Sequence, residues 1–318
     1  MLGFRDAITV AFLLGFAAIS PLKMPAQCTD QGVIPATFTP GPDYRSLVSG
    51  AIGATPAIGS ALSGITKFLW SDDSQQQVFN ALVAYVNQVV PGMIAQEHVQ
   101  QLQQHVAGLR AVLNDYNQTT DPVQKGEYLT TLISLLDELE PEFFDPRTPE
   151  RTLAHFVAFG SIRLVALREQ YLFAAQYYGA DPDRAAHLTL LQSNTARYTK
   201  AAADIRSRAM EWRLGMVNFA QNSTWNYGVR SKQQIFHTST RDDFCNANVN
   251  SYSGPSYPRS ARSLHAAYVA KVRAAFNHQL DLIMQPTTDW PKLNAVAPPP
   301  AHALLSAQGN SQIITGSE

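Results

Sequence analysis

Cysteine is almost absent: the chain of 318 residues contains two, Cys28 and Cys245. Two cysteines are too few for a disulfide scaffold, and their separation does not fit the paired spacing of a structural zinc site. In an oxidising compartment they can bond to each other. We therefore regard Cys28 and Cys245 as a candidate disulfide.

The chain also lacks an excess of charge of either sign. It has 24 Lys and Arg against 25 Asp and Glu, a formal net charge of -1, and an isoelectric point near 6.7. Binding to a nucleic acid duplex depends on a clustered basic face, and no such cluster is evident. The sequence therefore predicts no nucleic acid partner.

Catalytic signatures are missing as well. The sequence contains no G-x-S-x-G, no H-E-x-x-H, no Ser-x-x-Lys at a helix start and no glycine-rich phosphate loop. Its eight histidines are scattered, and His98 and His105 are the pair best placed to share a helix face. We expect no metal site, no cofactor and no enzymatic activity.

The first residues have the pattern of a secretory signal peptide. Arg5 precedes the apolar run Ala7 to Ile19, which is too short to span a bilayer and ends before Pro21. We expect residues 1–26 to be a signal peptide, residues 27–43 to be a linker, and the protein to be secreted. In an exported eukaryotic chain, Asn117 and Asn222 fit the glycosylation triplet.

One long apolar helix is predicted from Leu153 to Tyr178. Its 26 residues would extend about 39 Å, which exceeds the roughly 30 Å of a bilayer's hydrocarbon core. It also contains Arg163, Arg168 and Glu169, and three charges near a membrane centre would cost roughly 8 to 10 kcal/mol. The segment is therefore either a helix buried in a soluble bundle or one that enters a membrane only with a partner for its charges.

Amphipathic periodicity predicts further helices around this central one. The segment 44–70 is rich in glycine, which suits either close helix pairing as in membranes or a broken helix packed on a bundle. We predict an all-α bundle of about seven helices over residues 44–293, followed by a disordered tail over residues 294–318. The other predicted helices are those ending at Val89 and covering Met93 to Tyr116, Glu127 to Phe144, Asp181 to Met216 and Ser263 to Met284.

Two segments between these helices have more specific expectations. Gln221 to Arg262 has no helical periodicity and is predicted to be a long loop, with a short hairpin around Trp225 to Phe236. In the helix that precedes it, the basic side chains, Arg197 and Arg213 among them, are expected on the solvated face.

Acidic residues crowd the C-terminal end of the helix that precedes the central one. The helix dipole disfavours negative charge there, so these acids are either a solvated turn or have a function other than helix stability. The short connection Asp145 to Glu150 predicts an antiparallel hairpin with the central helix, in which basic side chains can face the acids. The candidate hairpin residues are Asp137, Glu138, Glu140, Glu142, His155, Arg163, Arg168 and Glu169.

The order of these elements resembles the N-terminal helical domain of the insecticidal three-domain crystal delta-endotoxins, over Leu47 to Leu293. The resemblance lies in a glycine-rich broken helix, amphipathic helices, an apolar central helix, and a last helix with basic residues before a Leu-Asp-x-Ile stretch and a later Pro and Asp. The residues that carry it are Tyr178, Gly179, Tyr198, Trp212, Lys271, Arg273, Phe276, Leu280, Asp281, Leu282, Ile283, Pro286 and Asp289.

This resemblance implies a membrane-perforating bundle whose fifth helix is wrapped by the others. The fourth and fifth helices, Glu127 to Phe144 and Leu153 to Tyr178, would insert as a hairpin into the lipid of a target cell and associate into an oligomeric pore. Asp137 and Glu138 would then favour cations, as rings of carboxylates do.

The sequence also departs from the family pattern. No run of alternating strands follows the last helix, so we expect neither the receptor-binding nor the β-sandwich domain of that family, and the receptor is unknown. The function predicted from the sequence is a secreted pore-forming toxin-like protein; the alternative is a secreted, non-lytic binding or effector protein that keeps the bundle.

Overall fold

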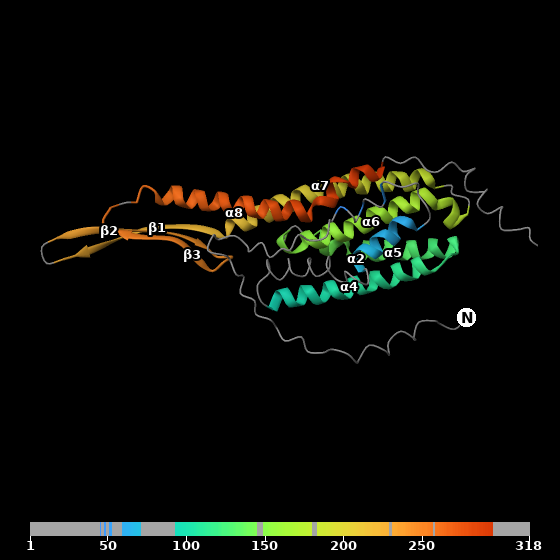
Figure 1. The fold of residues 1–318 in the computed structure, drawn as a ribbon, viewed down its shortest axis with the longest axis horizontal. Helices are drawn as coiled ribbons and strands as arrows, with labels where there is room; N and C mark the ends of the chain where they lie inside the picture. Colours follow the sequence, from blue (N-terminus) through green and yellow to red (C-terminus); the bar gives the residue numbers. More distant parts are fainter. Residues whose placement is uncertain are drawn as a thin grey trace, which may run out of the picture.

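The computed structural model describes residues 45, 48, 51–52, 59–70, 93–144, 149–179, 183–228, 231–256 and 258–294. In these ranges it has a helical bundle and a three-stranded sheet that projects from one end of the bundle beside the last helix (Figure 1). The elements in order are α2 (Ser60–Trp70), α4 (Met93–Gln118), α5 (Pro122–Phe143), α6 (Pro149–Tyr178), α7 (Arg184–Gly215), β1 (Val217–Tyr227), β2 (Lys232–Asp242), β3 (Ala247–Gly254), α8 (Ala261–Ile283), and the short 3-10 helices η1 (Gln285–Thr288) and η2 (Trp290–Asn294).

The helical bundle is confirmed, but the prediction of an all-α fold with about seven helices was too simple. The described residues contain six α-helices and also a sheet. The predicted signal peptide and linker, the helix predicted to end at Val89, and the predicted tail after its first residue lie outside the described residues. That first residue, Asn294, is ordered at the end of η2, so the tail begins no earlier than residue 295.

Local chemistry places the start of α5 earlier than predicted. Asp121 is extended and its side chain accepts a hydrogen bond from the backbone N–H of Val123, at 3.0 Å, which caps the first turn. Pro122 follows at the first helical position, where its missing N–H costs nothing. The helix therefore begins at Pro122 rather than Glu127.

The helix α6 lies at the centre of the bundle, in contact with α5, α7, α2 and the two 3-10 helices. From Phe156 to Tyr177 nearly every described side chain is buried, including those of Arg163, Arg168 and Glu169. The helix is not straight, because Phe173 has non-helical dihedral angles of φ -120° and ψ 15° and kinks the last turns.

The end of the described chain folds back onto this central helix. Trp290 in η2 is fully buried, and its indole Nε1 donates to the hydroxyl of Ser161 in α6, at 3.0 Å. Its ring packs edge-on against Phe156 and Tyr198, with centroids 5.7 and 6.1 Å away. Gly160 makes room for this packing, because a Cβ there would lie 2.9 Å from the Tyr198 ring. The 3-10 segment is therefore part of the core that fixes α6.

The segment predicted as a loop forms most of the antiparallel sheet β1-β2-β3, so that prediction was wrong apart from the hairpin, whose turn does follow Tyr227. Val217 pairs with Asp242 and Tyr227 with Lys232 along the β1–β2 ladder. Half of the strand residues are Asn, Gln, Ser or Thr, so the strands lack the apolar alternation by which a strand is recognised in a sequence.

A small second core joins the base of this sheet to the helices. Val217 of β1 packs with Tyr268 and Val272 of α8. Arg213, which was predicted to face solvent, is instead 1% exposed and pairs with Asp242 of β2. The helical pattern of α7 predicted that this side of the helix faces solvent, but the sheet covers it at Arg213.

Candidate functional site

The polar residues of α6 lie in two clusters at different heights of the bundle. We call them the Glu140 cluster (Asp137, Glu140, Arg163, Arg197 and Tyr198) and the Glu169 cluster (Gly59, Tyr116, Lys125, Glu169 and Tyr177). Both join α6 to its neighbours, and both are built around charges that have been removed from water.

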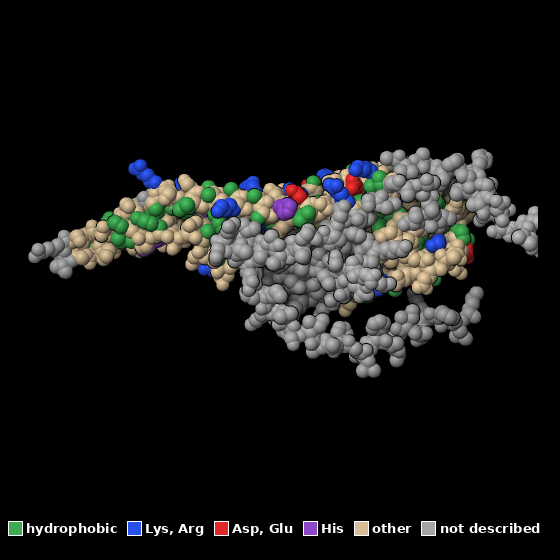
Figure 2. All heavy atoms as spheres, in the orientation of Figure 1, with side chains coloured by type: hydrophobic (Ala, Val, Ile, Leu, Met, Phe, Trp, Pro, Cys, Tyr) green, Lys and Arg blue, Asp and Glu red, His purple; other side chains and the backbone are tan. Residues whose placement is uncertain are grey.

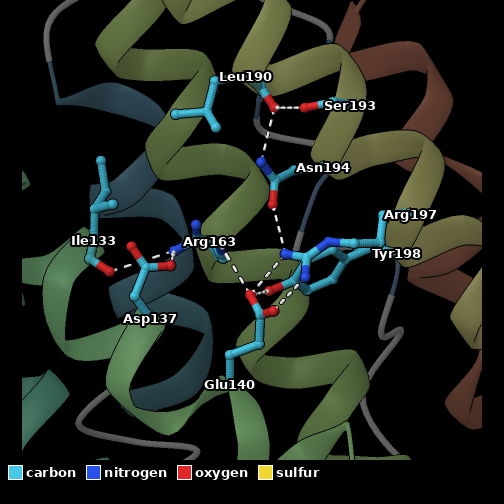
Figure 3. Close-up of polar contacts among 9 residues, drawn as sticks. All are labelled: Ile133, Asp137, Glu140, Arg163, Leu190, Ser193, Asn194, Arg197 and Tyr198. Carbon is cyan, nitrogen blue, oxygen red and sulfur yellow. Dashed lines mark hydrogen bonds and ion pairs between the residues drawn. The ribbon is translucent and has the colours of Figure 1, made fainter.

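The Glu140 cluster joins α5, α6 and α7 (Figure 3). Arg163 of α6 is 4% exposed; it forms an ion pair with Asp137 and donates from Nη1 to the carbonyl of Ile133, at 3.3 Å. Its Nε lies 3.8 Å from Glu140 Oε2. The buried guanidinium of the central helix is thus neutralised by the acidic end of α5, as the predicted hairpin requires.

Glu140 itself is bound mainly by α7. Its carboxylate accepts hydrogen bonds from both terminal nitrogens of Arg197, one at 2.8 Å, and from the hydroxyl of Tyr198 at 2.9 Å. Arg197 Nη2 also donates to Asn194 Oδ1, at 2.9 Å. Burial tends to raise the pKa of Glu140, but the hydrogen bonds from Arg197 and Tyr198 outweigh it and the pKa lies below its ordinary value. Glu140 is therefore an ionised link between α5 and α7.

The Glu169 cluster joins α6 to α4 and to the segment before α2. Glu169 is 2% exposed, and its Oε1 accepts hydrogen bonds from the backbone N–H of Gly59 at 2.6 Å, from the hydroxyl of Tyr177 at 2.8 Å, and from the hydroxyl of Tyr116. Gly59 has φ +80°, a conformation that favours glycine and that turns its N–H towards the carboxylate. Burial raises the pKa of Glu169, and these hydrogen bonds only partly oppose it.

Lys125 of α5 closes the same cluster. Its Nζ donates to the backbone carbonyl of Tyr116, at 2.8 Å, and lies 4.4 Å from the centre of the Tyr116 ring. Burial lowers the pKa of Lys125, while the carboxylate of Glu169 opposes this shift. Burial beside Glu169 also raises the pKa of the Tyr116 and Tyr177 hydroxyls, which therefore act as donors.

Arg168 lies next to Glu169 on α6 and is 3% exposed. Burial lowers the pKa of its guanidinium and Glu169 opposes that shift. Among the described residues, its Nε and Nη2 have no hydrogen-bond partner. Within the described residues, the charge that acts on Arg168 is Glu169 of its own helix, and no ion pair joins Arg168 to the acids of α5 that were predicted to face it.

The other predicted hairpin residues lie apart from the two clusters. Glu138 is exposed on α5, and Glu142 is 3.4 Å from His105 of α4 rather than from the central helix. His155 is half-buried and stacks on Phe159, with ring centres 6.2 Å apart. The structure therefore brings Asp137, Glu140 and Arg163 together, and leaves the remaining candidates elsewhere.

Sequence reasoning missed the partners that complete both clusters. Tyr116 and Tyr198 were predicted only as helix residues, Arg197 as a solvated cation, and Lys125 was not singled out. The one signal was a tyrosine on an apolar stripe, since a buried hydroxyl needs a hydrogen-bond partner. That signal says a partner exists, not which one.

The predicted modification and disulfide sites are placed unevenly. Asn117 is half-buried and accepts a hydrogen bond from Ser63, at 2.6 Å, whereas Asn222 is exposed on β1. Cys245 is disulfide-bonded. Its predicted partner Cys28 lies outside the described residues, so that pairing stays a prediction.

Chemically, the two clusters are suited to hold helices together rather than to transform a substrate. Within the described ranges, no three His, Cys, Asp or Glu side chains are grouped so that they could hold a metal ion. No helix in those ranges combines the length and apolar character needed to cross a membrane.

Comparison with known proteins identifies the family to which this bundle is similar. The family described as delta endotoxin, N-terminal domain, matches residues 47–227, more than half of the 318 residues. This confirms the resemblance seen in the sequence, and the match ends at the last residue of β1. No curated protein matches the chain.

Proposed function

The chain belongs to the delta-endotoxin N-terminal domain family, and from this premise we propose that it is a secreted protein that forms pores by inserting the α5–α6 hairpin into the lipid of a target cell. The observation that carries the proposal is that α6 is buried over nearly its whole length. Burying apolar side chains stabilises the bundle by about 25 cal/mol per Å². A bilayer offers those side chains a comparably apolar environment. The hairpin can therefore leave the interior of the bundle for the interior of the membrane.

The charges of α6 support a paired rather than a solitary entry. The partner of Arg163 is Asp137, which belongs to the same hairpin and would move with it. Arg168 and Glu169 are adjacent, and Tyr177 binds Glu169 from within α6. Inserting both helices together therefore lowers the roughly 8 to 10 kcal/mol that three unpaired charges would cost.

Other contacts of the two clusters hold the hairpin back. Tyr116 of α4 and Gly59 bind Glu169, while Arg197 and Tyr198 of α7 bind Glu140. These bonds must break before the hairpin leaves the bundle. We propose that the two clusters act as latches, which keep the hairpin in the soluble form until a membrane provides the alternative.

The inserted hairpins would associate into an oligomeric pore with α5 towards its lumen. Glu138 is exposed already in the bundle, and Glu140 would lose Arg197 if α7 stayed behind. Carboxylates lining a pore favour cations. A pore of this kind should therefore prefer cations over anions.

Dye release from lipid vesicles tests the proposal when combined with two thiol crosslinks. Glu140→Cys with Arg197→Cys ties α5 to α7, and Thr130→Cys with Tyr178→Cys ties α5 to α6, because those side chains bond at 2.8 and 3.1 Å in the native protein. A short bis-maleimide across the first pair should abolish leakage. The same reagent across the second pair should leave leakage intact, since that crosslink stays inside the hairpin.

Leakage that persists with α5 tied to α7 would contradict hairpin insertion. Silence of the unmodified protein at every pH and after limited proteolysis would contradict pore formation and favour the non-lytic binding protein instead. Export is tested separately, by sequencing the N-terminus of material recovered from the medium, where a start near residue 27 is expected.

A further inference from the structure

The sheet and the first half of α8 form a separate arm on the bundle. We define the sheet arm as β1, β2, β3, the connection from β3 to α8 that carries Arg259, and the part of α8 from Ala261 to Arg273. At about 3.3 Å per residue, a strand of 11 residues such as β1 extends roughly 36 Å, and Figure 1 shows the sheet projecting away from the other helices. The family match stops at Tyr227, so most of this arm lies outside the matched region.

The segment that contains the arm is rich in positive charge. Residues 212–280, from the end of α7 to the last turns of α8, contain eight Lys and Arg against two Asp, a formal charge of +6. The remaining residues contain sixteen Lys and Arg against 23 Asp and Glu, a formal charge of -7, so the near-zero net charge conceals two opposite regions.

The two acids of this segment do not offset the outer charges of the arm. Asp242 is buried against Arg213, and Asp243 pairs with Arg241 at the base of the sheet, at 2.7 Å. Further from the base, Lys232, Arg259 and Arg262 are exposed. On the face drawn in Figure 2, basic and hydrophobic side chains lie along the arm.

Large aromatic side chains are exposed at the far end of the sheet. Trp225 and Tyr227 are 49% and 71% exposed, and Lys232 lies over both rings, 4.3 and 5.3 Å from their centres. Alternate residues of a strand share a face, so both rings are on the face from which Phe219 contacts His265 of α8. This face is covered by α8 near the base and bears two open aromatic rings at its tip.

We propose that the sheet arm docks the protein onto an anionic lipid surface, with Trp225 and Tyr227 at the headgroup level and Lys232, Arg259 and Arg262 facing lipid phosphates and carboxylates. Trp and Tyr are the residues that favour the membrane interface, and exposed Lys and Arg are attracted to anionic leaflets. The rest of the chain has a formal charge of -7, so an anionic surface would repel it. This repulsion would orient the molecule with the arm towards the lipid. This inference rests on the proposed function, and it names the surface that the hairpin would enter.

Vesicle flotation of the full chain tests the docking step apart from leakage. The probes are vesicles of phosphatidylcholine alone and of phosphatidylcholine mixed with phosphatidylserine. We expect binding to the mixed vesicles only, with an affinity that falls as salt is raised. Lys232→Glu with Arg262→Glu should lower that binding by at least about tenfold, because each basic residue near the surface accounts for roughly fivefold.

A second variant tests how the aromatic side chains contribute to vesicle binding, and the basic and aromatic variants each have a matched control. Trp225→Ser with Tyr227→Ser should weaken binding to the mixed vesicles at all salt concentrations, since interfacial burial of rings is not screened. Lys200→Glu and Leu190→Ser change an exposed cation and an exposed apolar residue of α7 instead, and both should bind as the native chain does. Unchanged thermal unfolding of each variant excludes misfolding as the cause.

A tethering experiment separates this inference from the pore proposal. Arm variants carrying a histidine tag are attached to phosphatidylcholine vesicles that contain a nickel-chelating lipid, and leakage should then return. If the native chain binds anionic vesicles but causes no leakage even when it is tethered, the pore proposal is overturned and the docking proposal stands. Equal binding to both vesicle types, arm variants that bind like their controls, or a preference for duplex DNA over vesicles would overturn docking.

Discussion

Arg213 and Asp242 form a two-point ion pair that is almost completely removed from water. Nη1 of Arg213 lies 3.1 Å from Oδ1 of Asp242 and Nη2 lies 2.8 Å from Oδ2. Tyr268 of α8 donates to Oδ2 at 2.7 Å, and the backbone N–H of Phe244 donates to Oδ1 at 3.1 Å. One carboxylate therefore ties the end of α7 to the sheet and to α8, at the base of the arm.

Replacing Asp242 should be costly because it leaves Arg213 charged and buried. We expect Asp242→Ala to lower the free energy of unfolding by about 3 to 5 kcal/mol. Urea denaturation followed by circular dichroism measures the loss. Asp243→Ala is the control: its partner Arg241 is half exposed, so the loss should stay below about 1 kcal/mol. Equal losses in the two variants would contradict the role given to the buried pair.

Stability should depend on pH through Glu169. Burial raises the pKa of Glu169 in the folded protein above its ordinary value of 4.5. At a pH between the ordinary and the raised pKa, the folded state therefore binds the proton more tightly than the unfolded state. The free energy of unfolding therefore falls as the pH rises from about 4.5 through the raised pKa. Glu169→Gln keeps an oxygen for Gly59 and the two tyrosines but cannot ionise, so it should abolish this fall. Urea midpoints across the pH range measure it.

Glu140 provides the opposite case on the same bundle. The pKa of Glu140 is lowered in the folded protein, so the ionised side chain stabilises the fold at any pH above the ordinary pKa of a glutamate. This stabilisation is lost as the pH falls through the lowered pKa. Glu140→Gln should therefore reduce stability at neutral pH and flatten the acid limb of the curve. If Glu140→Gln and Glu169→Gln changed the pH curve in the same direction, at least one of the two environments would be misjudged.

The contact between α6 and α7 should tolerate no added carbon at Gly160. A Cβ there would lie 2.9 Å from the Tyr198 ring and 3.3 Å from that of Trp290, and both rings are fully buried. We expect Gly160→Ala to lower the free energy of unfolding by about 1 to 3 kcal/mol. At Gly108 in α4, an added Cβ would have no neighbour within 4 Å. Gly108→Ala should therefore raise the free energy of unfolding by about 0.5 to 1 kcal/mol, because alanine favours a helix over glycine. Thermal unfolding of both variants measures the difference.

Ion selectivity should report on the acids of α5. Glu138 is exposed, so Glu138→Gln should leave stability unchanged while moving the reversal potential of the pore towards that of a non-selective one. The measurement is conductance across a planar bilayer in a salt gradient. Glu211→Gln removes an exposed acid from α7, which the proposal leaves outside the membrane, and should not move the reversal potential.

Much of the bundle was predictable because helices are recognised by a local pattern. The apolar positions of α4, α5, α7 and α8 recur at helical spacing, and the central helix was evident because it is apolar on almost every side. The acids at the end of α5 were also noticed, because they oppose the dipole of their own helix. Pairing Asp137 and Glu140 with Arg163 then needed only a short connection between two helices.

The sheet and the partners of the clusters were not predictable by such means. The strands carry polar residues on both faces, so nothing in their alternation marks them as strands. The pairing of Arg213 with Asp242 joins a helix end to a strand 29 residues later, and that of Glu169 with Tyr116 joins helices 53 residues apart. No local rule gives the identity of such a partner.

The sequence by itself determined the helical bundle, its family and its most apolar helix, because helix formation and apolar burial depend on patterns that repeat every few residues. Tertiary structure alone decided which charged side chains are buried in ion pairs and which are exposed, and that Lys232, Arg259 and Arg262 lie on one arm. The physical reason is that electrostatic interactions depend on distance and burial in space, and the order of residues along the chain fixes neither until the helices have packed.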